Sequence, residues 1–253
     1  MDAPIAIALI GIAVIALVSG MAYYTIARSR DNSILAESQT AISKGREFSD
    51  DVRNLVTGGQ QSATMSYQYS FGYVTLLDDG TTVVKATIDG QPRNLVAVPH
   101  SKFAYVGKYS IFSTIPLYPL GVGDGAIATN TTYFTPIYYY SQQGYSYVIT
   151  NDRVYLQQTQ TQINEQLIQI YVITYTEASS GPPTGTVTLL PQTSTRTFTY
   201  NVYSSISITA TSGNDPLNPA NTLTQTWQPS SSVVGTVRIE LTQVNIQLSY
   251  AKS

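Results

Sequence analysis

The chain has 253 residues, of which 43% are hydrophobic and only 11% are charged, and its formal net charge is −2. Globular domains usually carry about 25% charged residues, so acid–base groups and metal carboxylates are scarce, which argues against most enzymes. The chain also lacks the clustered lysine and arginine that a nucleic-acid partner requires. Because there is no cysteine, disulfides, thiolate zinc sites and cysteine nucleophiles are excluded.

The first segment is strongly apolar, with no charged residue from 3 to 27. A helix of this length rises by about 37 Å, which is enough to cross a hydrocarbon core of about 30 Å. A secretory signal peptide has a shorter apolar stretch and a small-residue cleavage site. Ser19-Gly20-Met21-Ala22 imitates such a site only weakly. We therefore expect a retained apolar helix, with a removed signal peptide as the alternative.

The helical pattern continues beyond the apolar run. No proline occurs between Arg28 and Val56, and Gly58 supplies a common helix end. We expect one helix of about 55 residues and roughly 80 Å. Two interpretations are open: a membrane anchor followed by a stalk, or a helix that packs against copies of itself. The apolar residues of the second half recur at helical spacing and form one stripe: Ile34, Leu35, Ala41, Ile42, Phe48, Val52, Leu55 and Val56.

After Gly59 the period changes from helical to alternating. Apolar residues alternate with polar ones from Met65 to Tyr73, and Asp78-Asp79-Gly80 predicts a hairpin turn before a strand over 81–88. Leu167 to Tyr175 is apolar on both faces, as in a central buried strand. The last strand changes its apolar parity between Leu241 and Val244, which predicts a β-bulge.

These patterns predict an α+β fold in which a long N-terminal helix precedes an antiparallel, mostly β-sandwich or barrel-like domain. The expected boundaries are 1–57 for the helix and 58–253 for the β-domain. Turn-rich stretches at 121–125, 179–183 and 212–220 separate the strands. The β-domain is long for one immunoglobulin-like sandwich of about 100 residues, so an elaborated single domain and two fused sheets both remain open.

Candidate chemistry is sparse. His100 is the only histidine, and no group of acidic residues surrounds it in the sequence. We expect a surface or hydrogen-bonded side chain there. Asp78-Asp79-Gly80 and Gly123-Asp124-Gly125 lack the acidic spacing of a calcium loop and are better explained as turns. No phosphate-binding loop, nucleophile elbow or zinc-protease motif occurs. We predict no catalytic residue, metal or cofactor.

Tyrosine is abundant, with 20 residues. Tyr138-Tyr139-Tyr140, Tyr145 and Tyr147 lie in an uncharged stretch, and such a cluster suits a contact surface or the interior of a sheet. Asn130-Thr131-Thr132 is the only Asn-x-Ser/Thr sequon of the chain, and we expect it to be a glycan site if the protein is exported.

The charges that flank the apolar helix conflict with the composition of the β-domain. Arg28 and Arg30 follow the helix, whereas Asp2 alone precedes it, and the positive-inside rule would then leave the β-domain in the cytoplasm. A low-charge, cysteine-free domain with a sequon instead suits export. Either a basic leader once preceded residue 1 and was removed, or Met1 is the initiator and the rule fails.

The apolar start Met1-Asp2-Ala3-Pro4-Ile5 and the stretch Ala22 to Arg30, followed by polar residues to Gly45, resemble the layout of archaeal type IV pilins and archaellins. The resemblance covers mainly residues 1–57. It implies that a prepilin-type peptidase removes a basic leader. It also implies a helical filament with immunoglobulin-like β-domains as its outer wall. The glutamate of bacterial pilins is missing, because position 5 is Ile5.

The physics of the apolar helix supports such an assembly. About 20 apolar side chains would face water in an isolated chain, at a cost of ~1–2 kcal/mol each, and only lipid or identical copies remove it. We expect an extracellular filament subunit for adhesion or motility, inserted in the membrane before assembly. The alternatives are a membrane-anchored β-sandwich that binds the surface layer, or a virion membrane protein. The residues predicted to pack between copies are Ile5, Ala8, Leu9, Gly11, Ile12, Ala13, Ala16, Val18, Gly20, Tyr24, Ile34, Leu35, Ile42, Phe48 and Val52.

Overall fold

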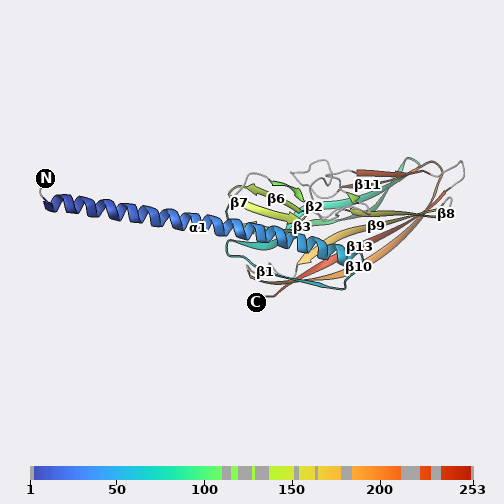
Figure 1. Ribbon diagram of the computed structural model, residues 1–253. Coiled ribbons are helices and arrows are strands. Elements are labelled where there is room, and N and C mark those ends of the chain that lie inside the picture. Colours follow the sequence, from blue (N-terminus) through green and yellow to red (C-terminus); the bar gives the residue numbers. More distant parts are fainter. Residues whose placement is uncertain are drawn as a thin grey trace.

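The computed structural model describes residues 3–109, 115–118, 127–128, 137–150, 154–162, 165–177, 184–211, 223–228 and 235–251. One helix, α1 (Ala3–Val56), leads into a β-domain, and its N-terminal half extends away from that domain (Figure 1). The helix ends as the sequence predicts: Gly58 has a φ of 77°, and the Gly59 N–H donates to the carbonyl oxygen of Asn54 at 2.7 Å. Beyond α1, the described residues contain strands and no further helix.

The β-domain consists of two curled sheets, so the predicted α+β class is confirmed. Most strand pairs are antiparallel, but β13 with β9 and β5 with β8 are parallel, which the sequence did not indicate. The first sheet has the order β1 (Ala63–Gln68), β10 (Thr184–Val202), β13 (Gly235–Ala251), β9 (Glu165–Glu177), β8 (Val154–Gln162) and β5 (Ile127–Ala128). The second has the order β12 (Leu223–Trp227), β11 (Ile206–Thr211), β2 (Gly72–Ile88), β3 (Gln91–Gly107), β7 (Tyr145–Thr150), β6 (Ile137–Gln142) and β4 (Ile115–Tyr118).

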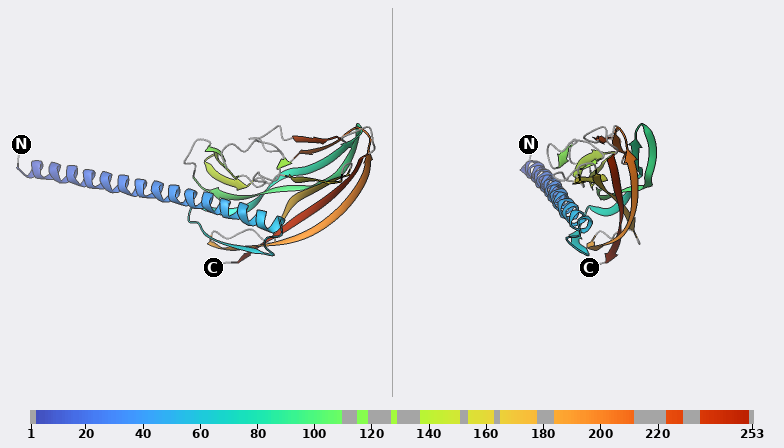
Figure 2. Two further views of the ribbon diagram at one scale, coloured as in Figure 1. Left: turned by 45° about the vertical axis from the view of Figure 1, so that its right-hand side comes forward. Right: turned by 90° about the vertical axis from the view of Figure 1, so that its right-hand side faces the viewer.

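Two large apolar clusters fill the β-domain. The cluster nearer α1 includes Phe48 and Val52 of the helix together with Phe103 of β3 and Val244 of β13. The second cluster joins β2, β3 and β11 to β8, β9 and β13 and includes fully buried Ile208. Figure 2 shows α1 lying along one flank of the β-domain while the long strands curl beyond the end of the helix. The C-terminal half of α1 is therefore part of the domain's core.

The predicted central position is confirmed, because β9 lies between β13 and β8. Burial on both faces holds only from Val172 to Tyr175, because Leu167 and Tyr171 are half-buried. The parity change in β13 is also present: Leu241 and Val244 are both buried, with two half-buried residues between them. The predicted bulge is wrong, however, because β13 pairs with β10 and β9 without a register shift. Leu241 belongs to the second cluster and Val244 to the cluster nearer α1. Since consecutive side chains of a regular strand point to opposite faces, the two clusters cover opposite faces of this sheet at its two ends.

The predicted hairpin turn at Asp78-Asp79-Gly80 is also wrong. These residues lie inside the continuous strand β2, at a register shift in its pairing with β3. The Asp79 carboxylate lies 2.8 Å from Nζ of buried Lys102. This sequence therefore forms an irregularity in the strand, and the irregularity directs the Asp79 side chain toward Lys102. The alternating run from Met65 to Tyr73 is likewise divided between β1 and β2, which belong to different sheets.

The β2–β3 hairpin instead turns at Asp89-Gly90, where both residues have positive φ values of 49° and 82°. The Asp89 carboxylate accepts hydrogen bonds from the N–H groups of Tyr203, Ser204 and Ser205 and from the Ser204 hydroxyl, at 2.7–3.2 Å. It therefore ties this turn to the segment between β10 and β11. The hydrogen bond from the Tyr203 N–H is the largest of the effects that lower the pKa of Asp89 to about 2.

We expect Asp89→Asn to lower the thermal midpoint at pH 6 by more than at pH 2. The folded-state pKa of Asp89 lies below its ordinary value of 3.8, so its stabilisation is fully present above that value and is lost as the pH falls through about 2. Thermal melts of both proteins across this range measure the difference. A gap between the two midpoints that stays constant down to pH 2 would contradict this role.

Candidate functional surface: the exposed half of the helix

The N-terminal half of α1 presents an apolar surface that the rest of the chain does not cover. From Ile12 to Ile26 every side chain is exposed, including Ile12 at 65%, Val18 at 58% and Ile26 at 69%. The described part of α1 contains an apolar window long enough to cross a membrane, and none of that window is buried. This surface is the most unusual feature of the molecule, because such a continuous apolar area is rare on a soluble monomer.

The structure separates the predicted packing residues into two groups. The exposed group comprises Ile12, Ala13, Ala16, Val18, Gly20 and Tyr24. In the second group, Ile34, Phe48 and Val52 are buried within the chain's own β-domain, and Leu35 and Ile42 are half-buried. The amphipathic stripe therefore attaches the helix to its own domain. The predictions for Ile5, Ala8, Leu9 and Gly11 concern side chains outside those that the structure describes.

A carboxylate fastens the helix where it enters the β-domain. Glu37 accepts hydrogen bonds from the N–H groups of Ser70 and Phe71, at 2.6 and 2.9 Å, and from the Tyr105 hydroxyl at 2.8 Å. It thereby holds the connection between β1 and β2 and also strand β3. Burial, with the nearby Glu37 charge as a smaller effect, raises the pKa of Tyr69. The sequence does not predict this contact, since no local pattern joins residues this far apart.

A second contact lies about two helical turns from Glu37 toward the N-terminus of α1. The guanidinium of Arg30 lies over the ring of Tyr109, 5.5 Å from its centroid, and Tyr109 meets Phe71 edge to face at 6.0 Å. The Ser146 hydroxyl donates to the Tyr109 carbonyl oxygen at 2.8 Å. Together with Glu37, these contacts fix the direction in which the exposed half of α1 leaves the β-domain.

Glu37→Gln should destabilise the domain by roughly 1–3 kcal/mol, because the amide replaces an ionised acceptor that receives several hydrogen bonds. Chemical denaturation measures this loss. Glu47→Gln is the matched control on the same helix: its carboxylate pairs with Lys44, at 2.6 Å, on the surface, where we expect a change below about 1 kcal/mol. Equal effects of the two substitutions would contradict the anchoring role of Glu37.

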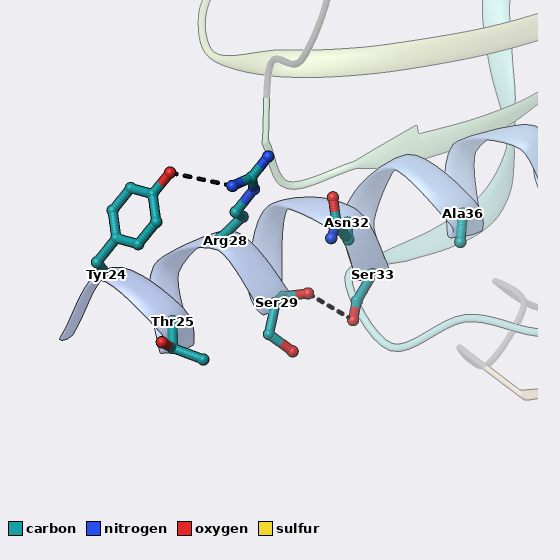
Figure 3. A pocket seen from close by; sticks show the side chains of 7 residues that line it. All are labelled: Tyr24, Thr25, Arg28, Ser29, Asn32, Ser33 and Ala36. Carbon is teal, nitrogen blue, oxygen red and sulfur yellow. Dashed lines mark hydrogen bonds between the residues drawn. The ribbon is translucent and has the colours of Figure 1, made fainter. Parts of the chain in front are cut away.

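Small side chains line the exposed helix between the apolar region and the domain. Thr25, Ser29, Ser33 and Ala36 recur every three or four residues and border a shallow depression of about 580 Å³ (Figure 3). The Thr25 and Ser33 hydroxyls donate to the carbonyl oxygens of Met21 and Ser29, at 2.8 and 2.9 Å. Because these two hydroxyls already have acceptors, a second helix can approach closely without leaving them unsatisfied.

Tyr24 and Arg28 form the opposite side of this depression. The Arg28 guanidinium donates to the Tyr24 hydroxyl at 3.2 Å, and both side chains extend from the same side of the helix (Figure 3). They mark the position where the apolar surface gives way to a charged one.

The only histidine lies inside the β-domain. His100 is 2% exposed, and its Nδ1 is 3.0 Å from the Thr82 hydroxyl, so the predicted hydrogen bond is present but the side chain is not on the surface. Its Nε2 lies 3.8 Å from the Asp79 carboxylate, which also contacts Lys102. Within the described ranges, no three His, Cys, Asp or Glu side chains form a group that could hold a metal.

The remaining predicted contact sites are only partly described. Tyr145 is exposed and Tyr147 is half-buried on β7, whereas the side chains of Tyr138-Tyr139-Tyr140 fall outside the described ones, although β6 itself pairs with β7. The sequon at Asn130 and the turn-rich stretches at 121–125, 179–183 and 212–220 also lie outside the described residues. The contact and glycan assignments therefore stay predictions.

No protein-family model, curated protein or solved structure matches the chain.

Proposed function

We propose that this chain is the structural subunit of an extracellular filament of the archaeal type IV pilus or archaellum kind, which polymerises through its N-terminal helix. One observation carries the proposal: the apolar half of α1 is exposed from Ile12 to Ile26, while the second half is embedded in the β-domain. An isolated chain in water would bear a penalty of tens of kcal/mol for this surface. The subunit therefore needs a permanent apolar environment.

Identical copies provide this apolar environment better than lipid does, for two reasons. The exposed helix continues past its apolar part into the small-residue face of Thr25, Ser29 and Ser33, which allows close approach of another helix. The contacts of Glu37 and Arg30 also hold the exposed half in one direction relative to the domain. A fixed angle lets every copy place its helix in a shared centre and its β-domain outside.

Withdrawal of detergent from the purified full-length chain tests the proposal. We expect polymers of constant diameter in electron micrographs, with the β-domains as the outer layer. Particles that stay single in detergent and enter lipid vesicles when it is withdrawn, without polymerising, would overturn the proposal and favour a membrane-anchored β-domain.

Mass spectrometry of the native N-terminus, compared with the encoding gene, is the second test. A removed basic leader supports the filament, and an intact translation start counts against it.

A further inference from the structure

One edge of the first sheet is left open by the described residues. Strand β10 has 19 residues, but β1 pairs only with its first six, from Thr184 to Leu189. From Leu190 to Val202 the strand pairs with β13 on one side and with no described strand on the other. Figure 2 shows β10, in orange, at the outer rim of the sheet. The N–H and C=O groups on that side have no partner among the described strands, and they offer a template for another strand.

The middle of this edge is also uncovered on both faces of the sheet. Every side chain from Gln192 to Thr197 is exposed, because this part of β10 lies between the two apolar clusters and belongs to neither. Sheet edges are usually protected by charges, prolines or a covering element. Here the edge carries one charge, Arg196, and one proline, Pro191 near its start. It is therefore open to strand addition.

The geometry points to β10 of a second copy of this chain as the strand that pairs with this edge, in antiparallel orientation about a two-fold axis at Thr195. Length excludes the described strands at the ends of the two sheets as partners, because β1, β12, β4 and β5 have six residues or fewer. Long parts of β2 and β3, from Gly72 to Thr82 and from Gln91 to Phe103, also pair on one side only among the described strands, and what selects β10 among these edges is its sequence. This inference does not depend on the filament proposal.

The sequence of β10 is compatible with pairing to itself in this register. Thr195 meets its own counterpart, Thr193 meets Thr197, and Leu190 meets Tyr200, so threonines face threonines and the two apolar side chains face each other. Ser194 lies opposite Arg196, so the two arginines are not directly opposed. Within the chain, the same face of β10 already uses a threonine pair, with the hydroxyls of Thr195 and Thr242 at 3.0 Å.

Single cysteines test the pairing in this cysteine-free chain. We expect Thr195→Cys to form a covalent dimer with a short thiol-reactive cross-linker, in detergent at high protein concentration. Tyr203→Cys is the control: Tyr203 is 68% exposed just beyond β10, but the two-fold axis places its two copies far apart. The expected dimer yield is at least tenfold higher at position 195. Equal yields at the two positions would overturn the inference.

A charge pair at position 194 provides a second readout. Ser194→Glu should increase the dimer yield of Thr195→Cys, because the new carboxylate faces Arg196 of the other copy, whereas Ser194→Lys should lower it by placing like charges opposite. Equal yields from these two variants would also overturn the inference. If polymers form but Thr195→Cys gives no cross-link, only the edge pairing is refuted. If the cross-link forms but polymers do not, only the filament proposal is refuted.

Discussion

Gly20→Leu should abolish or strongly reduce polymerisation while leaving the β-domain folded. Gly20 lies on the exposed part of α1, and an added Cβ would meet no atom of the chain within 4 Å. The isolated chain should tolerate leucine, which is also a better helix former than glycine by about 0.8–1 kcal/mol. Between closely packed helices, the larger side chain would cost about 1–3 kcal/mol at each contact. Sedimentation after detergent withdrawal measures the loss.

Gly20→Ala is the matched control for this prediction, because it changes helix propensity in the same direction but adds only one methyl group. We expect polymers from the alanine variant and an unchanged thermal midpoint of the β-domain for both variants. Normal polymers from Gly20→Leu would show that Gly20 is not a site of close helix packing.

The second large effect concerns the buried half of the same helix. Phe48 is fully buried and stacks on Phe103, with ring centroids 4.0 Å apart and an angle of 6° between the rings, and it also contacts Tyr175 at 5.8 Å. Phe48→Ala should destabilise the β-domain by about 3–5 kcal/mol. Because whole domains are stable by only about 5–15 kcal/mol, the variant should unfold at a much lower denaturant concentration.

A chain that lacks residues 3–27 is the control for this prediction. Residues 12–26 of that segment are exposed and belong to neither large apolar cluster, so its removal should leave the unfolding transition of the β-domain nearly unchanged. If removing the exposed segment destabilised the domain as much as Phe48→Ala does, the assignment of the two helix halves to different roles would be wrong.

The helix was the most predictable part of the fold. Its apolar stripe and its end near Gly58 follow from spacing and local backbone preference, and both are confirmed. The spacing did not predict which surface packs against the stripe, because a period of 3.6 shows that one face is buried but not what covers it. Phe48 and Val52 were assigned to packing between copies and instead lie in the chain's own core.

The strands were predictable in type but not in pairing. Asp78-Asp79-Gly80 has the composition of a turn, yet it lies inside β2, where Asp79 contacts Lys102 of the neighbouring strand. The parity change in β13 was real, yet its cause is a sheet covered on opposite faces at its two ends. Both differences depend on contacts between distant segments, which local composition does not encode.

The exposed surface of α1 was predicted from composition, whereas its attachment was not. Charge-free residues from 3 to 27 identify the apolar half. Glu37 gave no signal, since its hydrogen-bond partners Ser70, Phe71 and Tyr105 lie more than 30 positions away.

The central claim is that identical helices, and not lipid, shelter the apolar half of α1. Thiol reactivity of Val18→Cys in lipid-free particles formed after detergent withdrawal tests it most directly, because the chain has no other cysteine. We predict that a water-soluble maleimide labels Cys at 18 at least tenfold more slowly than Cys at 203 in the matched Tyr203→Cys variant. Equal labelling rates at the two positions, or protection that persists only while lipid or detergent stays bound, would contradict the claim.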